Sequence, residues 1–567
     1  MAEFSFGIGV HSFREIREEG CVYVDKTRLI ERLVHPSPDK VCLFTRPRRF
    51  GKTLAMTMLR EFFSIETQSG HLFDGLEIAG NEEITKNWMN QYPTILLSFK
   101  SVEGNDFTEA FGQFRELAIR LCSGYSFLLQ SEKVDFADKR VLAKIMAGEE
   151  DTVIFSNLLG ALSSALEAFY GKKVIILIDE YDVPLAKAEE KGFYSNMAMF
   201  FTSLLGSALN DNPSLKFAVL SGCLSISKES VYTGTNNISC YGISEIKFSD
   251  CFGFTESEVC CLLSSTGYQE KLGELRDWYD GYRFGDGQEI YCPWDVLRFL
   301  KSLQDKPQAK PRSFWRNTSG NDVIRRFLEH ATTGALEGIA SLARGESIET
   351  EIDESITYDE LFLTQENMWT MLYLTGYLTK SIVNDSDFTS SESKVCLRIP
   401  NREINDIFNH TIRIWNHKKI KLAQNKTFFN AFWDGNEQIV GKVISELLMK
   451  IISFRADHEN YYHGFLTGLL AASGYTVSSN SESGDGLPDI IVADLANKRV
   501  AIVEINYAKA IPLLSREVGN ALTQIRKKRY DAPYRAKGVR LVHWGMAFSG
   551  KDCLAGFMEP GRKTPVR

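Results

Sequence analysis

The amino-acid sequence predicts an α/β protein with an N-terminal parallel sheet, a helical middle region and a smaller C-terminal α/β part. In residues 37–240, short β-branched runs alternate with longer helical patterns, as buried parallel strands and their crossover helices do. Residues 245–440 have mostly helical periodicity. Near the C-terminus, the apolar runs 488–492 and 500–504 flank a short polar turn, which indicates a β-hairpin.

The length of the chain indicates several domains, and its charge limits how it could contact nucleic acid. At 567 residues the chain exceeds what one hydrophobic core usually supports. The predicted division is 1–245, 246–440 and 441–567. The net charge of −8 excludes a uniformly basic coat for nucleic acid, so such contacts need local basic patches. Residues 46–49 and 526–529 are the candidates.

Cysteine usage and hydropathy indicate the compartment. Eleven cysteines are scattered along the chain without a C-x-x-C pair. This pattern argues against a zinc ribbon or a disulfide framework and fits a reducing cytoplasm. No apolar run approaches the roughly 20 residues that cross a membrane, and Glu3 and Arg14 make the N-terminus unlike a signal peptide. We therefore expect a cytoplasmic protein that binds no membrane.

Two segments have the spacing of the two halves of a nucleotide site. The first is the apolar run 41–44, which leads into residues 45–53 and ends in Gly51-Lys52-Thr53. At the start of a helix, this triplet offers backbone amides and an ammonium to phosphate oxygens, and a hydroxyl to Mg²⁺. The segment therefore predicts a P-loop NTPase-like fold that binds ATP with Mg²⁺.

The second half follows the apolar run 174–178, which ends in Asp179-Glu180. Asp179 is expected to orient Mg²⁺, and Glu180 is expected to polarise the attacking water. A buried strand followed by a loop explains either half alone, but the two together favour a nucleotide site. A third run ends at Ser221, which either senses the terminal phosphate or only terminates a strand.

The first half departs from the P-loop pattern at Arg46, which occupies the position of that pattern's first glycine. The segment from Arg46 to Arg49 would instead form a stiffer and very basic loop. Both arginines are candidate phosphate ligands, and one could contact nucleic acid or a transferring phosphoryl group. The alternative is a solvated basic turn. The loop predicts nucleotide binding and leaves the rate of hydrolysis open.

Several strings together point to a known family. They are Tyr23-Val24-Asp25-Lys26-Thr27, residues 46–53, Asp179-Glu180-Tyr181-Asp182, Lys228-Glu229-Ser230, Asn236-Asn237, Trp278-Tyr279-Asp280-Gly281-Tyr282-Arg283-Phe284 and Tyr462-His463-Gly464-Phe465. With them the chain resembles, over nearly its whole length, bacterial AAA-ATPase-like proteins with a C-terminal PD-(D/E)XK nuclease superfamily domain. In that family a basic residue commonly follows the third strand. Here the matching stretch is Cys223-Leu224-Ser225-Ile226, which contains no basic residue, so the sequence does not predict tight coupling of hydrolysis to motion.

The resemblance implies a restriction-endonuclease-like α/β domain in residues 441–567. Its reaction needs an aspartate and a glutamate on neighbouring strands to hold Mg²⁺ or Mn²⁺, and a lysine two residues beyond the glutamate. Asp489 and Glu504 fit the two acids, whereas Asn506 stands at the lysine position. The alternative is a pair of solvated strand-end carboxylates. Lys509 is the candidate replacement for the lysine.

Three further positions belong to this resemblance. Glu459 corresponds to the helical acid that completes the metal shell in the superfamily, and Gln524 and Tyr530 resemble the family's supporting helix. His463 is expected to make a structural hydrogen bond rather than to bind zinc.

The expected function is nucleotide-regulated action on nucleic acid, either DNA or RNA. One alternative is a nucleotide-dependent binding or regulatory switch whose nuclease fold does not cleave. Another is a scaffold that uses ATP only to lock its conformation. An oligomer is compatible with the sequence.

Overall fold

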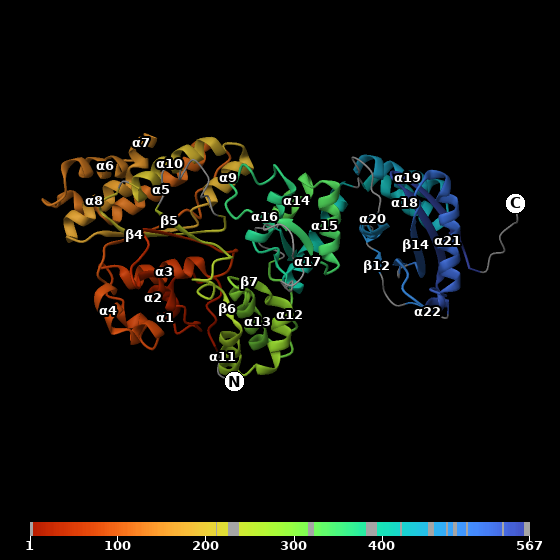
Figure 1. Cartoon of the computed structure of the whole chain (residues 1–567), viewed down its shortest axis with the longest axis horizontal. Coiled ribbons are helices and arrows are strands. Elements are labelled where there is room, and N and C mark those ends of the chain that lie inside the picture. Colours follow the sequence, from red (N-terminus) through yellow and green to blue (C-terminus); the bar gives the residue numbers. More distant parts are fainter. Residues whose placement is uncertain are drawn as a thin grey trace. The chain divides into compact units, whose positions relative to one another are not determined.

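The structure is a computed structural model (Figure 1). It describes residues 4–210, 212–224, 237–315, 322–381, 394–419, 422–451, 459–471, 475–479, 483, 485–494, 497–535 and 538–560. The chain divides into two compact units: Met1–Phe314 with Glu349–Ile404, and Trp315–Ile348 with Asn405–Arg567. The three-part division at residues 245 and 440 stays a prediction.

The first unit contains the predicted parallel sheet. Its five strands have the order β2-β3-β4-β1-β5, and all paired neighbours run parallel. They are β1 (Val41–Thr45), β2 (Thr94–Ser98), β3 (Val174–Asp179), β4 (Leu215–Gly222) and β5 (Ile238–Tyr241). All side chains of β1 and β3 are buried, because helices cover both faces of a parallel sheet. The carboxyl ends of the strands therefore meet at one edge, which positions the polar residues that follow them.

Helices flank this sheet on both sides, α1 to α4 on one and α5, α6, α8 and α10 on the other (Figure 1). The first group is α1 (Phe13–Glu18), α2 (Arg28–Val34), α3 (Lys52–Phe63) and α4 (Glu82–Trp88). The second is α5 (Phe107–Gly124), α6 (Phe136–Met146), α8 (Leu158–Tyr170) and α10 (Tyr194–Leu209). The same part of the chain also contains α7 (Thr152–Ser156) and α9 (Val183–Lys191). The doubly covered parallel sheet confirms the predicted N-terminal α/β fold.

The middle of the chain is helical, as predicted, but it also contains two small sheets. Its helices are α11 (Glu256–Thr266), α12 (Leu272–Tyr279), α13 (Pro293–Asp305), α14 (Asp322–His330), α15 (Thr333–Ala343), α16 (Gln365–Leu374) and α17 (Arg402–Lys419). One sheet joins β6 (Phe254–Thr255), β8 (Gln288–Tyr291) and β7 (Tyr282–Phe284), and the other joins β10 (Thr379–Lys380), β11 (Lys394–Arg398) and β9 (Ile348–Glu351). Most of these strands are too short for their alternation to stand out from helical periodicity.

The second unit is built on a mixed five-stranded sheet with the order β12-β13-β14-β15-β16. The strands are β12 (Thr476–Ser479), β13 (Ile490–Asp494), β14 (Arg499–Tyr507), β15 (Arg540–Ser549) and β16 (Asp552–Met558). Only β14 and β15 run parallel among the described pairs. The predicted hairpin is β13–β14, which confirms the C-terminal α/β fold.

Helices cover both faces of this sheet, with α21 on one face and α18, α19 and α20 on the other (Figure 1). They are α18 (Leu422–Asp434), α19 (Glu437–Ile451), α20 (Glu459–Ala471), α21 (Leu514–Lys527) and α22 (Ala532–Arg535). Gly545 lets α21 approach closely, because a Cβ there would lie 2.7 Å from the Val518 carbonyl oxygen. In the described parts of the chain, no helix is long and apolar enough to cross a membrane.

Candidate functional site

The loop between β1 and α3 places Lys52 at the start of a helix. Gly51 precedes the helix with a φ of 85°, a left-handed conformation that glycine adopts without strain. The Lys52 ammonium donates to the carbonyl oxygens of Arg46 at 2.8 Å and Pro47 at 2.9 Å. The helix amides and the lysine therefore face the same loop, where an anion would be stabilised.

Asp179 joins three segments at the carboxyl edge of the parallel sheet. Its side chain is 1% exposed. Its Oδ2 accepts a hydrogen bond from the Thr53 hydroxyl at 2.8 Å, and its Oδ1 accepts one from the Ser221 hydroxyl at 2.6 Å. The structure thus brings the ends of β3 and β4 to the first turn of α3. A carboxylate and a hydroxyl are oxygen ligands of the kind Mg²⁺ prefers, so the residues present fit this ion.

Glu180 follows Asp179 in a strained backbone conformation. Its φ is 51°, in the left-handed region that residues other than glycine rarely occupy. Burial raises the pKa of Glu180, and the neighbouring charge of Asp179 raises it further, while Lys52 lowers it. Strain of this kind tends to be kept where function requires a fixed side-chain position. The Glu180 carboxyl therefore lies beside the predicted nucleotide site with an enhanced tendency to hold a proton.

Asp489 and Glu504 are brought together in the second unit. The pairing of Ile490 with Val503 sets Asp489 opposite Glu504. The Asp489 carboxylate accepts from the Ile505 amide at 2.7 Å, and Glu504 accepts from the Asp489 amide at 3.4 Å. Glu504 is 3% exposed, and burial raises the pKa of Asp489. A buried and a half-buried acid at adjacent positions repel each other unless a cation or a proton lies between them.

Comparison with known proteins assigns both regions. Residues 7–232 match the family model described as "Predicted AAA-ATPase", and residues 457–557 match that of the "PD-(D/E)XK nuclease superfamily". The chain contains both domains. It is also 24% identical over 581 residues to a protein of Azotobacter chroococcum mcd 1 described as "Uncharacterized protein in vnfD 5'region", with 97% of each chain covered.

In the nuclease superfamily domain, the residue at the lysine position points to a helix. The Asn506 amide nitrogen donates to the Glu517 carbonyl oxygen in α21 at 3.0 Å. Lys509 lies beyond the end of β14 and is exposed, without a hydrogen bond or ion pair to the described residues. Neither Asn506 nor Lys509 bonds to the two acids among the described residues, and Lys509 as the replacement lysine stays a prediction.

Other residues around the two acids come from both flanking helices. The Gln524 amide of α21 donates to the Glu504 carboxylate. The His463 ring nitrogen Nε2 lies 2.9 Å from the Asp489 carbonyl oxygen, which confirms the predicted structural hydrogen bond. Glu459 is the first residue of α20, and its side chain lies outside the described residues. Among the described residues, no group of three or more His, Cys, Asp or Glu side chains could hold a metal ion.

In the AAA-ATPase domain, Arg46 is fully buried. Its guanidinium donates to the carbonyl oxygens of Thr45, Tyr241, Gly242 and Phe248 at 2.7–3.0 Å. Burial lowers the pKa of Arg46 to about 10, so it stays charged at neutral pH. Since the side chain is committed to these carbonyls, the function proposed below does not include it as a phosphate ligand.

The rest of this loop packs against the middle of the chain. The ring centroids of Phe50 and Tyr282 lie 4.9 Å apart, and the Arg49 guanidinium lies over the ring of Trp294. A Cβ on Gly376 would lie 2.7 Å from the Pro47 Cβ, so only glycine fits there. Aromatic residues of the middle region therefore support the P-loop.

Asp182 is a site residue that sequence reasoning missed. Its carboxylate accepts from the amides of Cys223 at 2.7 Å and Leu224 at 3.1 Å, and from the Tyr358 hydroxyl at 3.0 Å. The string Asp179-Glu180-Tyr181-Asp182 was the available signal. Ser225-Ile226, Lys228-Glu229-Ser230 and Asn236 of the family resemblance lie outside the described residues.

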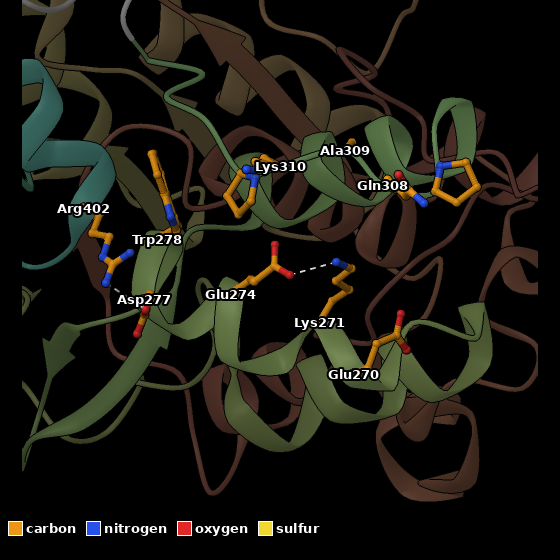
Figure 2. Close-up of a pocket in the computed structure, with 11 residues that line it drawn as sticks. Glu270, Lys271, Glu274, Asp277, Trp278, Gln308, Ala309, Lys310 and Arg402 are labelled. Atoms are coloured by element: carbon orange, nitrogen blue, oxygen red, sulfur yellow. Dashed lines mark hydrogen bonds and ion pairs between the residues drawn. The ribbon is translucent and has the colours of Figure 1, made fainter. Parts of the chain in front are cut away.

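A surface pocket of about 490 Å³ lies between α12 and residues 307–311 (Figure 2). Four of its charged groups form pairs, Lys271 with Glu274 at 2.8 Å and Arg402 with Asp277 at 3.2 Å. None of the predicted site residues lines it. The pocket is therefore not part of either candidate site.

Proposed function

We propose that the AAA-ATPase domain binds Mg²⁺–ATP and hydrolyses it, and that the nucleotide controls a metal-dependent site for nucleic acid in the nuclease superfamily domain. The observation that carries the first part is the position of Asp179, whose two oxygens accept from Thr53 and Ser221 beside Lys52. A hydroxyl, a carboxylate and an ammonium converge there, as phosphoryl transfer requires.

Each residue of the nucleotide site has a distinct task. Lys52 would exchange its loop carbonyls for phosphate oxygens, since an ammonium bonds more strongly to an anion than to a neutral carbonyl. Thr53 and Asp179 would hold Mg²⁺, which neutralises the charge of the phosphates. Glu180 would accept the proton of the water that attacks the terminal phosphorus, as the bond to the leaving ADP oxygen breaks.

In the nuclease superfamily domain, Asp489 and Glu504 would hold Mg²⁺ or Mn²⁺ against a phosphodiester. Gln524 orients the Glu504 carboxylate. The predicted basic patch at 526–529 continues from Gln524 at the end of α21, and Lys527 and Lys528 in it are exposed. Cations beside a metal site would attract the phosphate backbone.

One observation favours a second candidate function, a nucleotide-dependent reader that binds nucleic acid without cutting it. The Asn506 amide bonds to the Glu517 carbonyl oxygen, so this position supplies no cation to the reacting phosphate. Two carboxylates can still bind a metal ion without that cation. The reader shares the metal and nucleic-acid binding of the first proposal and differs only in cleavage.

One assay separates these functions. The purified protein is incubated with labelled DNA and RNA, with and without Mn²⁺ and ATP, and cleavage, binding and phosphate release are measured. Cleavage that requires Mn²⁺ and disappears in Asp489→Ala supports the nuclease. Metal-dependent binding without cleavage supports the reader. Absence of both binding and cleavage in every condition overturns the nucleic-acid proposal, and absence of phosphate release overturns hydrolysis.

A further inference from the structure

Tyr358 is a buried tyrosine that lies far from the nucleotide site in sequence but contacts one of its residues. We propose that Tyr358 is a positioning residue of the nucleotide site that acts through Asp182 on the segment that follows β4. The inference rests on the function proposed for this site. It adds a residue that the family motifs around the P-loop do not contain.

The Asp182 carboxylate is the link. It is 3% exposed, and its Oδ2 accepts three hydrogen bonds from Cys223, Leu224 and Tyr358. Hydrogen bonds to a charged acceptor are stronger than those between neutral groups. The Tyr358 hydroxyl therefore helps to fix the carboxylate that holds the backbone of residues 223–224.

The same backbone is held from a second direction by Tyr181. Its hydroxyl donates to the Leu224 carbonyl oxygen at 2.6 Å. A Cβ on Gly222 would lie 2.5 Å from the Tyr181 ring, so glycine is required for the ring to pack there. Residues 222–224 are thus fixed by two adjacent side chains that directly follow Asp179 and Glu180.

This segment carries groups that reach the reacting region. Ser221, at the end of β4, donates to Asp179, and the Cys223 thiol lies 3.6 Å from the Lys52 ammonium. A displacement of residues 221–224 would move both groups relative to the phosphate-binding loop. The Tyr358 hydroxyl donates to Asp182, so its effect on the reaction is expected to pass through that carboxylate.

Tyr358 also belongs to a segment that is anchored near Arg46. Four residues earlier, the Glu354 carboxylate accepts from the Ser244 hydroxyl, and a Cβ on Gly242 would lie 2.5 Å from the same carboxylate. The Gly242 carbonyl oxygen in turn accepts from Arg46. The segment that contains Glu354 and Tyr358 thus contacts both the residues that bind Arg46 and the residues that hold the end of β4. Through these contacts, a residue outside the sequence motifs can set the geometry of the nucleotide site.

The test is Tyr358→Phe, which removes one hydroxyl. ATP hydrolysis should lose about tenfold in kcat, the size expected for one hydrogen bond to a charged group. KM for ATP should change less than about twofold, because Lys52 and the helix amides are untouched. Tyr291→Phe is the matched control, since this buried tyrosine also donates to a carboxylate, that of Glu256. Tyr291→Phe should leave kcat unchanged, although it should lose about as much thermal stability as Tyr358→Phe.

A double-mutant cycle tests the route through Asp182. If Tyr358 acts through this carboxylate, adding Tyr358→Phe to Asp182→Asn should lower kcat by less than about twofold further. Full additivity of the two effects, or an unchanged kcat in Tyr358→Phe, overturns the inference.

A second readout does not depend on turnover. Alkylation of Cys223 by iodoacetamide, followed by peptide mass spectrometry, reports how tightly residues 223–224 are held. The rate should rise at least about threefold in Tyr358→Phe and not in Tyr291→Phe, since opening of a segment follows the loss of the contacts that hold it. If the wild type hydrolyses no ATP, the proposed function fails, while this rate still decides whether Tyr358 positions the segment. Equal rates in wild type and Tyr358→Phe contradict it.

Discussion

The Thr53 hydroxyl donates a hydrogen bond of 2.8 Å to Asp179, a residue 126 positions further along the chain. The bond connects the first turn of α3 to the end of β3. The sequence predicted that both residues serve one nucleotide site, and the structure adds their direct contact. Because both groups are oxygen ligands, a Mg²⁺ ion bound here would be held by two segments whose separation is set by the parallel sheet.

Replacing Lys52 by alanine should weaken ATP binding by about 1.5–3 kcal/mol, the range of hydrogen bonds to charged groups. The change removes the ammonium that lies over the loop. Titration calorimetry with ATP and Mg²⁺ measures the effect. Lys187→Ala is the control, since Lys187 pairs with Glu190 on the surface of α9. Equal affinities for wild type and Lys52→Ala would contradict the proposed site.

Glu180→Gln should keep ATP binding and lose hydrolysis. Glutamine has nearly the same shape as glutamate but cannot accept the proton of the attacking water. Nucleotide affinity and the rate of phosphate release, measured on the same preparation, separate the two effects. A variant that hydrolyses ATP like the wild type would show that Glu180 is not the base.

The acid side of the pH profile should reflect the raised pKa of Glu180. Burial and the charge of Asp179 move this pKa above the ordinary value of 4.5. A base must be ionised, so kcat should fall as the pH drops through a pKa higher than that of an exposed glutamate. Steady-state hydrolysis measured between pH 4.5 and 8 checks this. A profile that stays flat down to pH 4.5 would speak against Glu180.

Arg46→Met should destabilise the protein by about 3–5 kcal/mol, as the removal of a buried charged partner does. Four carbonyl oxygens would lose their common donor. Arg46→Lys should restore little, because an ammonium does not reproduce the planar fork of a guanidinium. Urea unfolding gives the free energies, with the partly exposed Arg115→Met as the control. A loss below about 1 kcal/mol would mean that the loop folds without this residue.

Asp489→Ala should abolish binding of Mn²⁺ to the nuclease superfamily domain, because one of two converging carboxylates is removed. Lys509→Ala should spare the metal and impair only cleavage, if Lys509 replaces the missing lysine. Calorimetric titration with Mn²⁺ and a cleavage assay measure the two effects. Normal cleavage by Lys509→Ala would rule out that replacement. In a wild type that binds without cutting, Asn506→Lys should restore some cleavage.

Local signals were sufficient for much of the fold. The apolar runs ending at Asp179 and Ser221 predicted buried parallel strands, and the turn near Asn497 predicted the β13–β14 hairpin. These are properties of consecutive residues, so periodicity reveals them. The short strands of the middle region were not predicted, because a strand of two to five residues has too few positions to show alternation.

The sequence by itself determined the helix start at Gly51-Lys52-Thr53 and the place of Asp179 at a strand end, since both follow from residue type and neighbouring residues. Asp489 and Glu504 were indicated by the family resemblance. Only the tertiary structure decided what Arg46 and Asp182 do. The carbonyl oxygen of Tyr241 lies 195 residues from Arg46, and Tyr358 lies 176 residues from Asp182. From the sequence, Arg46 was a candidate phosphate ligand with a solvated turn as the alternative, because its distant partners were not known. The difference arises because backbone conformation depends on local sterics, whereas the burial and partners of a charged group depend on distant segments of the folded chain.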